Sequence, residues 1–146
     1  MKHPRRSQCI DVLAFASQIG LVVLVVLAGC SDSTGSCIDI DSACTPLYEP
    51  TFQNVFDNTL RPRCGVGGST CHSAQAAQGG LIFADVDQSY NLLVGARRVE
   101  PENPGCSLLL ERIAASDSAR VMPPGNPLEA SEICSIEKWV TMGASR

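Results

Sequence analysis

Apolar residues recur at helical spacing over most of the chain after residue 50. The first apolar face has the spacing i, i+3, i+4 and i+8, which is typical of one side of an α-helix. Its members are Phe52, Val55, Phe56 and Leu60. We expect this helix to end at Pro62, because proline lacks an amide donor and disfavours helix in the residue before it.

Three later segments, residues 90–94, 108–114 and 131–142, show the same periodicity. Gly143 follows the last of them and suits the left-handed conformation that commonly ends a helix. Strand-like alternation is nearly absent, and residues 81–83 (LIF) are the only strand candidate. The pattern therefore predicts an all-α domain with about four helices.

The longest apolar run of the chain, residues 19–27 (IGLVVLVVL), follows the basic residues Lys2, Arg5 and Arg6. A basic start followed by a short apolar run is typical of an export signal. The alternative is a membrane-spanning anchor, but the run is too short to cross a bilayer. Lengthening the run would bury Asp11 in the membrane, at a high cost in free energy.

The apolar run leads into the residues Leu27-Ala28-Gly29-Cys30. Small residues followed by a cysteine resemble the lipobox of bacterial lipoproteins, in which the thiol takes up a diacylglyceryl group before cleavage. We therefore expect residues 1–29 to be a signal peptide and Cys30 to be lipidated. The protein would then lie in the bacterial cell envelope, held by its lipid to a membrane. The leaflet, and whether the membrane is the inner or the outer one, stay open.

Charge and length limit what the remainder can be. Without residues 1–29 the chain has 8 basic and 14 acidic residues, a net charge of −6. A nucleic-acid partner is not expected, because nucleic-acid binders carry a basic face. We expect residues 30–49 to form a lipidated tether, with residues 31–36 (SDSTGS) as a flexible spacer. Residues 50–146 would form a single small domain.

Four cysteines are expected in disulfides, because an exported chain folds in an oxidising compartment. Cys37 and Cys44 are close in sequence and predict a small disulfide loop, with pairing into the domain as the alternative. Cys106 and Cys134 each have apolar neighbours and are expected to pair with one another in the core. Such a bond would stabilise the fold by about 3 to 4 kcal/mol. Two buried free thiols are the other interpretation.

Two further short motifs contain residue types that bind cofactors. Cys71 is followed directly by His72, and Met122 is followed by Pro123 and Pro124. In c-type cytochromes a cysteine beside a histidine attaches a haem vinyl group, while the adjacent imidazole binds the iron. A methionine before a proline is pushed out of helical conformation and can supply the opposite ligand from a loop.

These residues carry a family resemblance over residues 51–144. The chain resembles the small cytochrome c-like domains of secreted bacterial proteins, which typically read CxxCH, GL, PG with SxL, MPPG, and EI leading to W and GA. The matching stretches are Cys71-His72, Gly80-Leu81, Pro104-Gly105, Ser107-Leu108, Met122-Pro123-Pro124-Gly125, Glu132-Ile133, Trp139-Val140 and Gly143-Ala144. The resemblance implies an all-α cytochrome c fold and haem c with iron as the cofactor. It further implies His72 and Met122 as the iron ligands, with other envelope redox proteins as partners.

The first cysteine of the motif departs from the family. Position 68 is Gly68, and the nearest upstream cysteine is Cys64, so the spacing is C-x6-C-H. The glycines between the cysteines could let the inserted residues loop out, so that Cys64 attaches the second vinyl group. Otherwise Cys71 forms a single thioether, or Cys64 and Cys71 form a disulfide in a domain without haem.

Two classes of function follow. The first is a lipid-anchored haem protein that transfers single electrons. The second is a haem-free, disulfide-stapled lipoprotein that acts as a binding or structural module. An enzyme is not expected, because residues adjacent in sequence, such as Cys71 and His72, rarely form a nucleophile–base pair. Zinc bound by Cys64, Cys71 and His72 would lack an evident fourth ligand.

Overall fold

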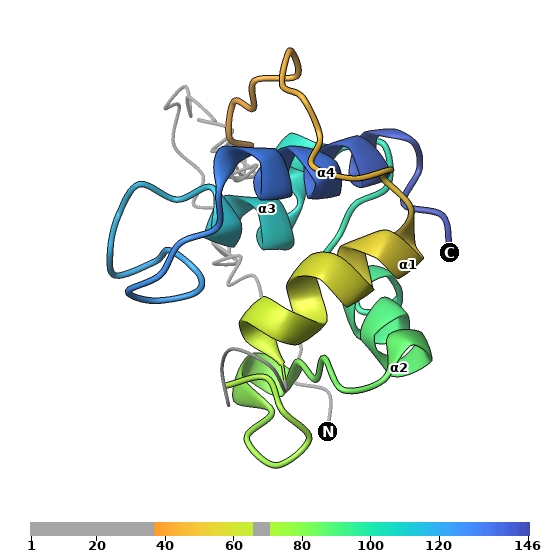
Figure 1. Cartoon of the computed structure of the whole chain (residues 1–146), viewed down its shortest axis with the longest axis vertical. Helices are drawn as coiled ribbons and strands as arrows, with labels where there is room; N and C mark the ends of the chain where they lie inside the picture. The colour runs from red at the N-terminus through yellow and green to blue at the C-terminus, as the bar shows by residue number, and fades with distance from the viewer. Residues whose placement is uncertain (1–36, 66–70) are drawn as a thin grey trace, which may run out of the picture. The chain divides into compact units, whose positions relative to one another are not determined.

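The computed structural model describes residues 37–65 and 71–146 (Figure 1). The expected signal peptide, the expected lipidation site Cys30 and the expected spacer 31–36 lie outside the described residues. Within the described ranges, no helix is long and apolar enough to cross a membrane.

The described chain is helical, and the predicted all-α class is confirmed. Helix α1 (Phe52–Val55) continues as the π-helix η1 (Phe56–Cys64), and α2 (Val86–Tyr90) continues as the π-helix η3 (Asn91–Gly95). Two further α-helices follow, α3 (Leu108–Ile113) and α4 (Ala130–Thr141), and two short 3₁₀ turns are η2 (Gln78–Gly80) and η4 (Pro104–Cys106). No strand occurs in these ranges, and residues 81–83, the strand candidate, are irregular.

The first helix does not end at Pro62, so that prediction is wrong. The helix widens into π turns and continues to Cys64, where the amide of Gly65 donates to the carbonyl oxygen of Leu60 at 3.0 Å. A proline inside a helix costs about 3 kcal/mol. Burying one large apolar side chain contributes about 1.5 to 3 kcal/mol. Because Phe56, Leu60 and Cys64 are all buried on this helix, packing outweighs the lost hydrogen bond.

Helix α4 packs against α1 through its tryptophan. The Trp139 ring lies 5.1 Å from the Phe52 ring, centroid to centroid, and both side chains are buried. The Trp139 indole nitrogen donates to the carbonyl oxygen of Ser145 at 2.8 Å, which folds the chain end back on the helix. Gly143 has a φ of 97°, so the predicted left-handed helix end is confirmed.

Both disulfides differ from the expected pairing. Cys37 is bonded to Cys106, and Cys44 is bonded to Cys134. The expected Cys106–Cys134 bond and the expected Cys37–Cys44 loop are therefore wrong, and the alternative of pairing into the domain holds. The reason is the course of the segment 37–49, whose two cysteines meet different elements: Cys37 meets η4 and Cys44 meets α4.

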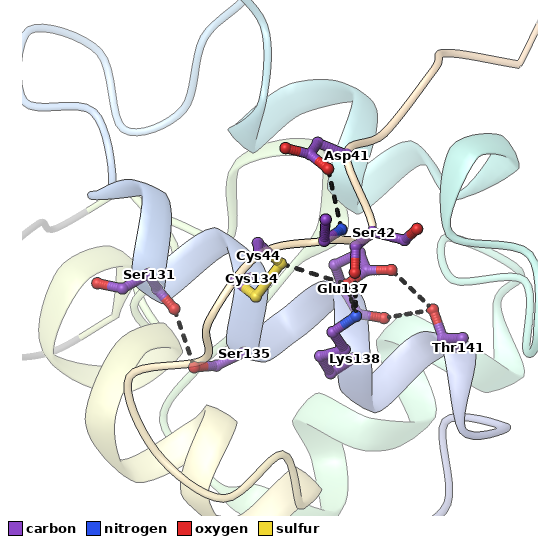
Figure 2. A network of polar contacts seen from close by, with 10 residues as sticks. Asp41, Ser42, Cys44, Ser131, Cys134, Ser135, Glu137, Lys138 and Thr141 are labelled. Atoms are coloured by element: carbon purple, nitrogen blue, oxygen red, sulfur yellow. Dashed lines mark hydrogen bonds and ion pairs between the residues drawn. A yellow bond between two sulfur atoms is a disulfide. The ribbon is translucent and has the colours of Figure 1, made fainter.

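Hydrogen bonds fix the same segment along these elements. The amide of Ile38 donates to the carbonyl oxygen of Gly105 at 3.0 Å. Figure 2 shows the contacts around α4, where the Lys138 ammonium group donates to the carbonyl oxygen of Ser42 at 2.5 Å. Further along, the amide of Leu47 donates to the Ser135 hydroxyl at 2.8 Å. Residues 37–49, which we expected within the tether, are thus bound to the domain.

Candidate functional site

A cavity of about 340 Å³ opens among four parts of the chain. These parts are residues 71–83, the segment from η3 to Arg98, helix α3, and the loop before α4. Most of its wall is apolar. The wall includes the apolar residues Leu81, Phe83, Leu93, Leu108, Leu109 and Ile113. Cys71, His72 and Met122 line the same cavity, so the fold brings together three residues that the sequence singled out.

Main-chain contacts position His72 at this cavity. Its amide donates to the carbonyl oxygen of Cys64 at 3.2 Å, and its own carbonyl oxygen accepts from the amide of Phe83 at 2.8 Å. Gly65 packs directly against the backbone of Phe83. A Cβ at Gly65 would lie only 2.4 Å from the carbonyl oxygen of Phe83. The end of η1, His72 and Phe83 therefore form one closely packed backbone unit.

The His72 imidazole sits in a mostly apolar environment. Its ring packs edge-on against the Phe83 ring, with centroids 5.3 Å apart. Its Nδ1 atom is buried and has no hydrogen-bond partner among the described residues. A buried polar atom without a partner costs about 1 to 3 kcal/mol. The ring is thus held in the cavity wall by packing and by its backbone, and its Nδ1 atom could still form a bond to a further group.

Met122 is positioned by a backbone contact with α3. Its amide donates to the carbonyl oxygen of Arg112 at 3.0 Å, and the amide of Val121 donates to the carbonyl oxygen of Asp117 at 2.9 Å. The Met122 side chain is half-buried and packs on the core. The loop that carries the methionine is therefore tied to the end of the helix that forms part of the cavity wall.

Residues 69–126 match the family model of Planctomycete cytochrome C. This match supports a cytochrome c-like domain in this part of the chain. The matched span includes Cys71, His72 and Met122, the three residues that the cavity brings together. A search of curated proteins and a search of solved structures find no match to the chain.

Cys64 and Cys71 occupy different environments. Cys71 is half-buried and lines the cavity. Cys64 is 7% exposed, belongs to the hydrophobic core and is not among the lining residues. Burial raises the pKa of the Cys64 thiol to about 11. The two cysteines are not joined in a disulfide, although backbone bonding brings Cys64 close to His72.

Two arginines that sequence reasoning missed also line the cavity. Arg98 donates to the carbonyl oxygens of Leu92 and Gly79, both at 2.9 Å, and Arg112 lies at the end of α3. Within the described ranges, neither arginine forms an ion pair and no Asp or Glu lines the cavity. No motif marks these arginines in the sequence. Only the fold shows that the cavity of an acidic protein is positively charged.

A second cluster of side chains that could in principle bind a metal lies at α4 and the segment packed against it. Ligand atoms of Cys44, Cys134 and Glu137 lie within 4.8 Å of one another (Figure 2). Both sulfurs are already joined in the disulfide, so neither is available as the thiolate that binds metals. The Glu137 carboxylate is buried and accepts from the Thr141 hydroxyl at 3.0 Å, while Lys138 lies 3.6 Å away. This cluster joins the segment 37–49 to α4 in the structure.

Proposed function

We propose that this protein binds haem c in the cavity and transfers single electrons in the bacterial cell envelope. One observation carries the proposal: a single, mostly apolar cavity is lined by Cys71, His72 and Met122. These are the residue types that attach haem and bind its iron from both sides in c-type cytochromes. In the sequence, Cys71 and His72 precede the helices that contribute to the cavity wall, and Met122 follows them.

The other features of the cavity fit a haem group. Haem is a flat apolar body with two carboxylates, and the wall is apolar with two guanidinium groups, Arg98 and Arg112. A volume of about 340 Å³ lies within the range of small-molecule sites, roughly 300 to 1,000 Å³. The His72 imidazole, with a buried ring nitrogen that lacks a hydrogen-bond partner among the described residues, has the donor chemistry that iron takes.

Each residue would have a definite role. Cys71 would hold the haem covalently, and His72 and Met122 would be its iron ligands. A bound haem supplies one-electron chemistry, and the protein supplies ligation, burial and access. Pairing a methionine with a histidine raises the reduction potential. The apolar wall of Leu93, Leu109 and Ile113 would keep water from the group.

We further propose that the domain works at a membrane, held there by lipid on Cys30 after removal of residues 1–29. Support comes from the basic start, the apolar run and the small residues before Cys30. Its partners would be other redox proteins of the envelope. Changing Cys30 to Ala should release the protein from the membrane fraction, and a variant that is still diacylated and membrane-bound would contradict the anchor.

The haem proposal is tested by an absorption spectrum of the protein purified from the cells that naturally make it. We expect a c-type spectrum that survives denaturation and extraction with acidified organic solvent, because a thioether is covalent. A colourless protein in which Cys64 and Cys71 are linked to one another would overturn the proposal. The haem-free, disulfide-stapled lipoprotein would then take its place.

A further inference from the structure

We propose that Cys71 alone attaches the haem, through a single thioether, and that Cys64 keeps its thiol as part of the hydrophobic core. This inference rests on the proposed function, since it concerns how the same group is held. It departs from the two-thioether attachment that a CxxCH motif provides.

The first argument is the position of the two side chains. Cys71 contributes to the cavity wall beside His72. Cys64 lies one helical turn beyond Leu60, on the buried side of η1, and both belong to the same core cluster. A thiol must reach the group it attaches, and of these two cysteines only Cys71 lines the space where that group would lie.

The second argument is that Cys64 cannot turn towards the cavity without breaking the unit that positions His72. The carbonyl oxygen of Cys64 accepts from the His72 amide at 3.2 Å. Its neighbour Gly65 lies against the carbonyl oxygen of Phe83, where even a Cβ would be 2.4 Å away. Rotating the end of η1 would therefore disturb the histidine that the same haem requires as a ligand.

The covalent step involves one bond and no change in redox state. The Cys71 thiol adds across one vinyl group of a haem that enters the cavity. Sulfur bonds to the inner carbon, and the thiol hydrogen ends on the outer carbon, which becomes a methyl group. The second vinyl group stays intact, and so does the Cys64 thiol.

A single tryptic peptide reports the outcome. There is no Lys or Arg between Arg63 and Arg97, so residues 64–97 contain both cysteines. The experiment denatures protein purified from the cells that naturally make it, alkylates it with iodoacetamide without reduction, and measures the mass of this peptide. We expect the mass of the peptide plus one haem plus one carbamidomethyl group, the latter on Cys64.

The other masses are distinct. One haem with no carbamidomethyl group would mean two thioethers, which overturns this inference but supports the proposed function. A peptide without haem, carrying two carbamidomethyl groups or an internal disulfide, would overturn both. A Cys64→Ala variant should keep its covalent haem to within about twofold of wild type, whereas Cys71→Ala should lose covalent attachment. Loss of covalent haem from folded Cys64→Ala protein would also contradict the single-thioether attachment.

Discussion

The main-chain amide of His72 donates a hydrogen bond to the carbonyl oxygen of Cys64, 3.2 Å away. This bond brings together the two ends of the insertion that separates Cys64 from the Cys-His pair. His72 also bonds through its carbonyl oxygen to the amide of Phe83. The histidine is therefore positioned by the end of the first helix and by the backbone of Phe83, and not by its neighbours in sequence alone.

The first prediction concerns the close approach at Gly65. A Gly65→Ala variant would place a Cβ 2.4 Å from the carbonyl oxygen of Phe83, so one of the two segments must move. We expect a loss of about 1 to 3 kcal/mol in the free energy of unfolding, because overpacking at rigid backbone is destabilising. We also expect a lower haem content, since the shift moves His72.

Gly95 provides the matched control. A Cβ built there meets nothing within 4 Å, and its φ is not positive. Gly95→Ala should leave stability unchanged or raise it by about 0.4 to 1 kcal/mol, because alanine restricts the unfolded chain. Urea unfolding of the two variants measures the difference. Equal midpoints for Gly65→Ala and wild type would show that the close packing against Phe83 has no energetic importance.

The second prediction concerns the arginines of the cavity. Arg98→Gln or Arg112→Gln should weaken binding of a dicarboxylate porphyrin by about 2- to 10-fold, a range typical of partly exposed charge pairs. The measurement is a fluorescence titration with iron-free protoporphyrin in a Cys71→Ala background, where nothing becomes covalent. Because no iron is present, ligation by His72 and Met122 does not contribute.

Two controls isolate the charge effect. Arg97 neighbours Arg98 but is 81% exposed in its side chain, pairs with Glu100 and does not line the cavity. Arg97→Gln should leave the affinity unchanged. The porphyrin dimethyl ester, which has no carboxylates, should bind the Cys71→Ala protein equally with and without Arg98→Gln. If the ester discriminates between them as strongly as the free acid does, the arginine acts through shape and not through charge.

The third prediction concerns the disulfides. Peptide mapping without reduction should link the fragment of Cys37 to that of Cys106 and the fragment of Cys44 to that of Cys134. Removing the second bond with Cys44→Ala and Cys134→Ala together should lower the free energy of unfolding by about 2 to 5 kcal/mol, because the bond closes a long loop. Recovery of a Cys106–Cys134 fragment pair would contradict the structure.

Local patterns in the sequence predict the helices well, because burial determines where helices form and apolar spacing reports burial. The exception is the end of the first helix. The proline rule considers only the local backbone, whereas the continuation through Pro62 depends on tertiary packing of Leu60 and Cys64. No periodicity in the sequence distinguishes π turns from α turns at this place.

The site is predictable to the extent that it depends on residue type. Cys71, His72 and Met122 stand out because few other side chains attach or ligate haem. The disulfide pairing could not be deduced, because it depends on the course of the segment 37–49 across η4 and α4. The contribution of Arg98 depends likewise on the fold, since hydrogen bonds to backbone carbonyl oxygens hold its guanidinium group at the cavity.

The last prediction concerns Met122, the proposed second iron ligand. The Met122 side chain lines the cavity, and its loop is held by the bond from its amide to the carbonyl oxygen of Arg112. Met122→Ala keeps this backbone bond and removes only the thioether. Covalent haem should therefore remain, while the reduction potential falls by something on the order of 100 mV, since axial ligands set haem potentials over a wide range. Potentiometric titration measures the shift.

Met142 is the control for this change, because it is 61% exposed and lies outside the cavity. Met142→Ala should leave the potential unchanged. The Met122→Ala protein should also bind added imidazole, because the iron ligand that Met122 would supply is then missing, whereas wild type and Met142→Ala should resist imidazole at the same concentration. If Met122→Ala has the wild-type potential and does not take up imidazole, Met122 is not an iron ligand. Met122 would then serve only to pack the loop against α3.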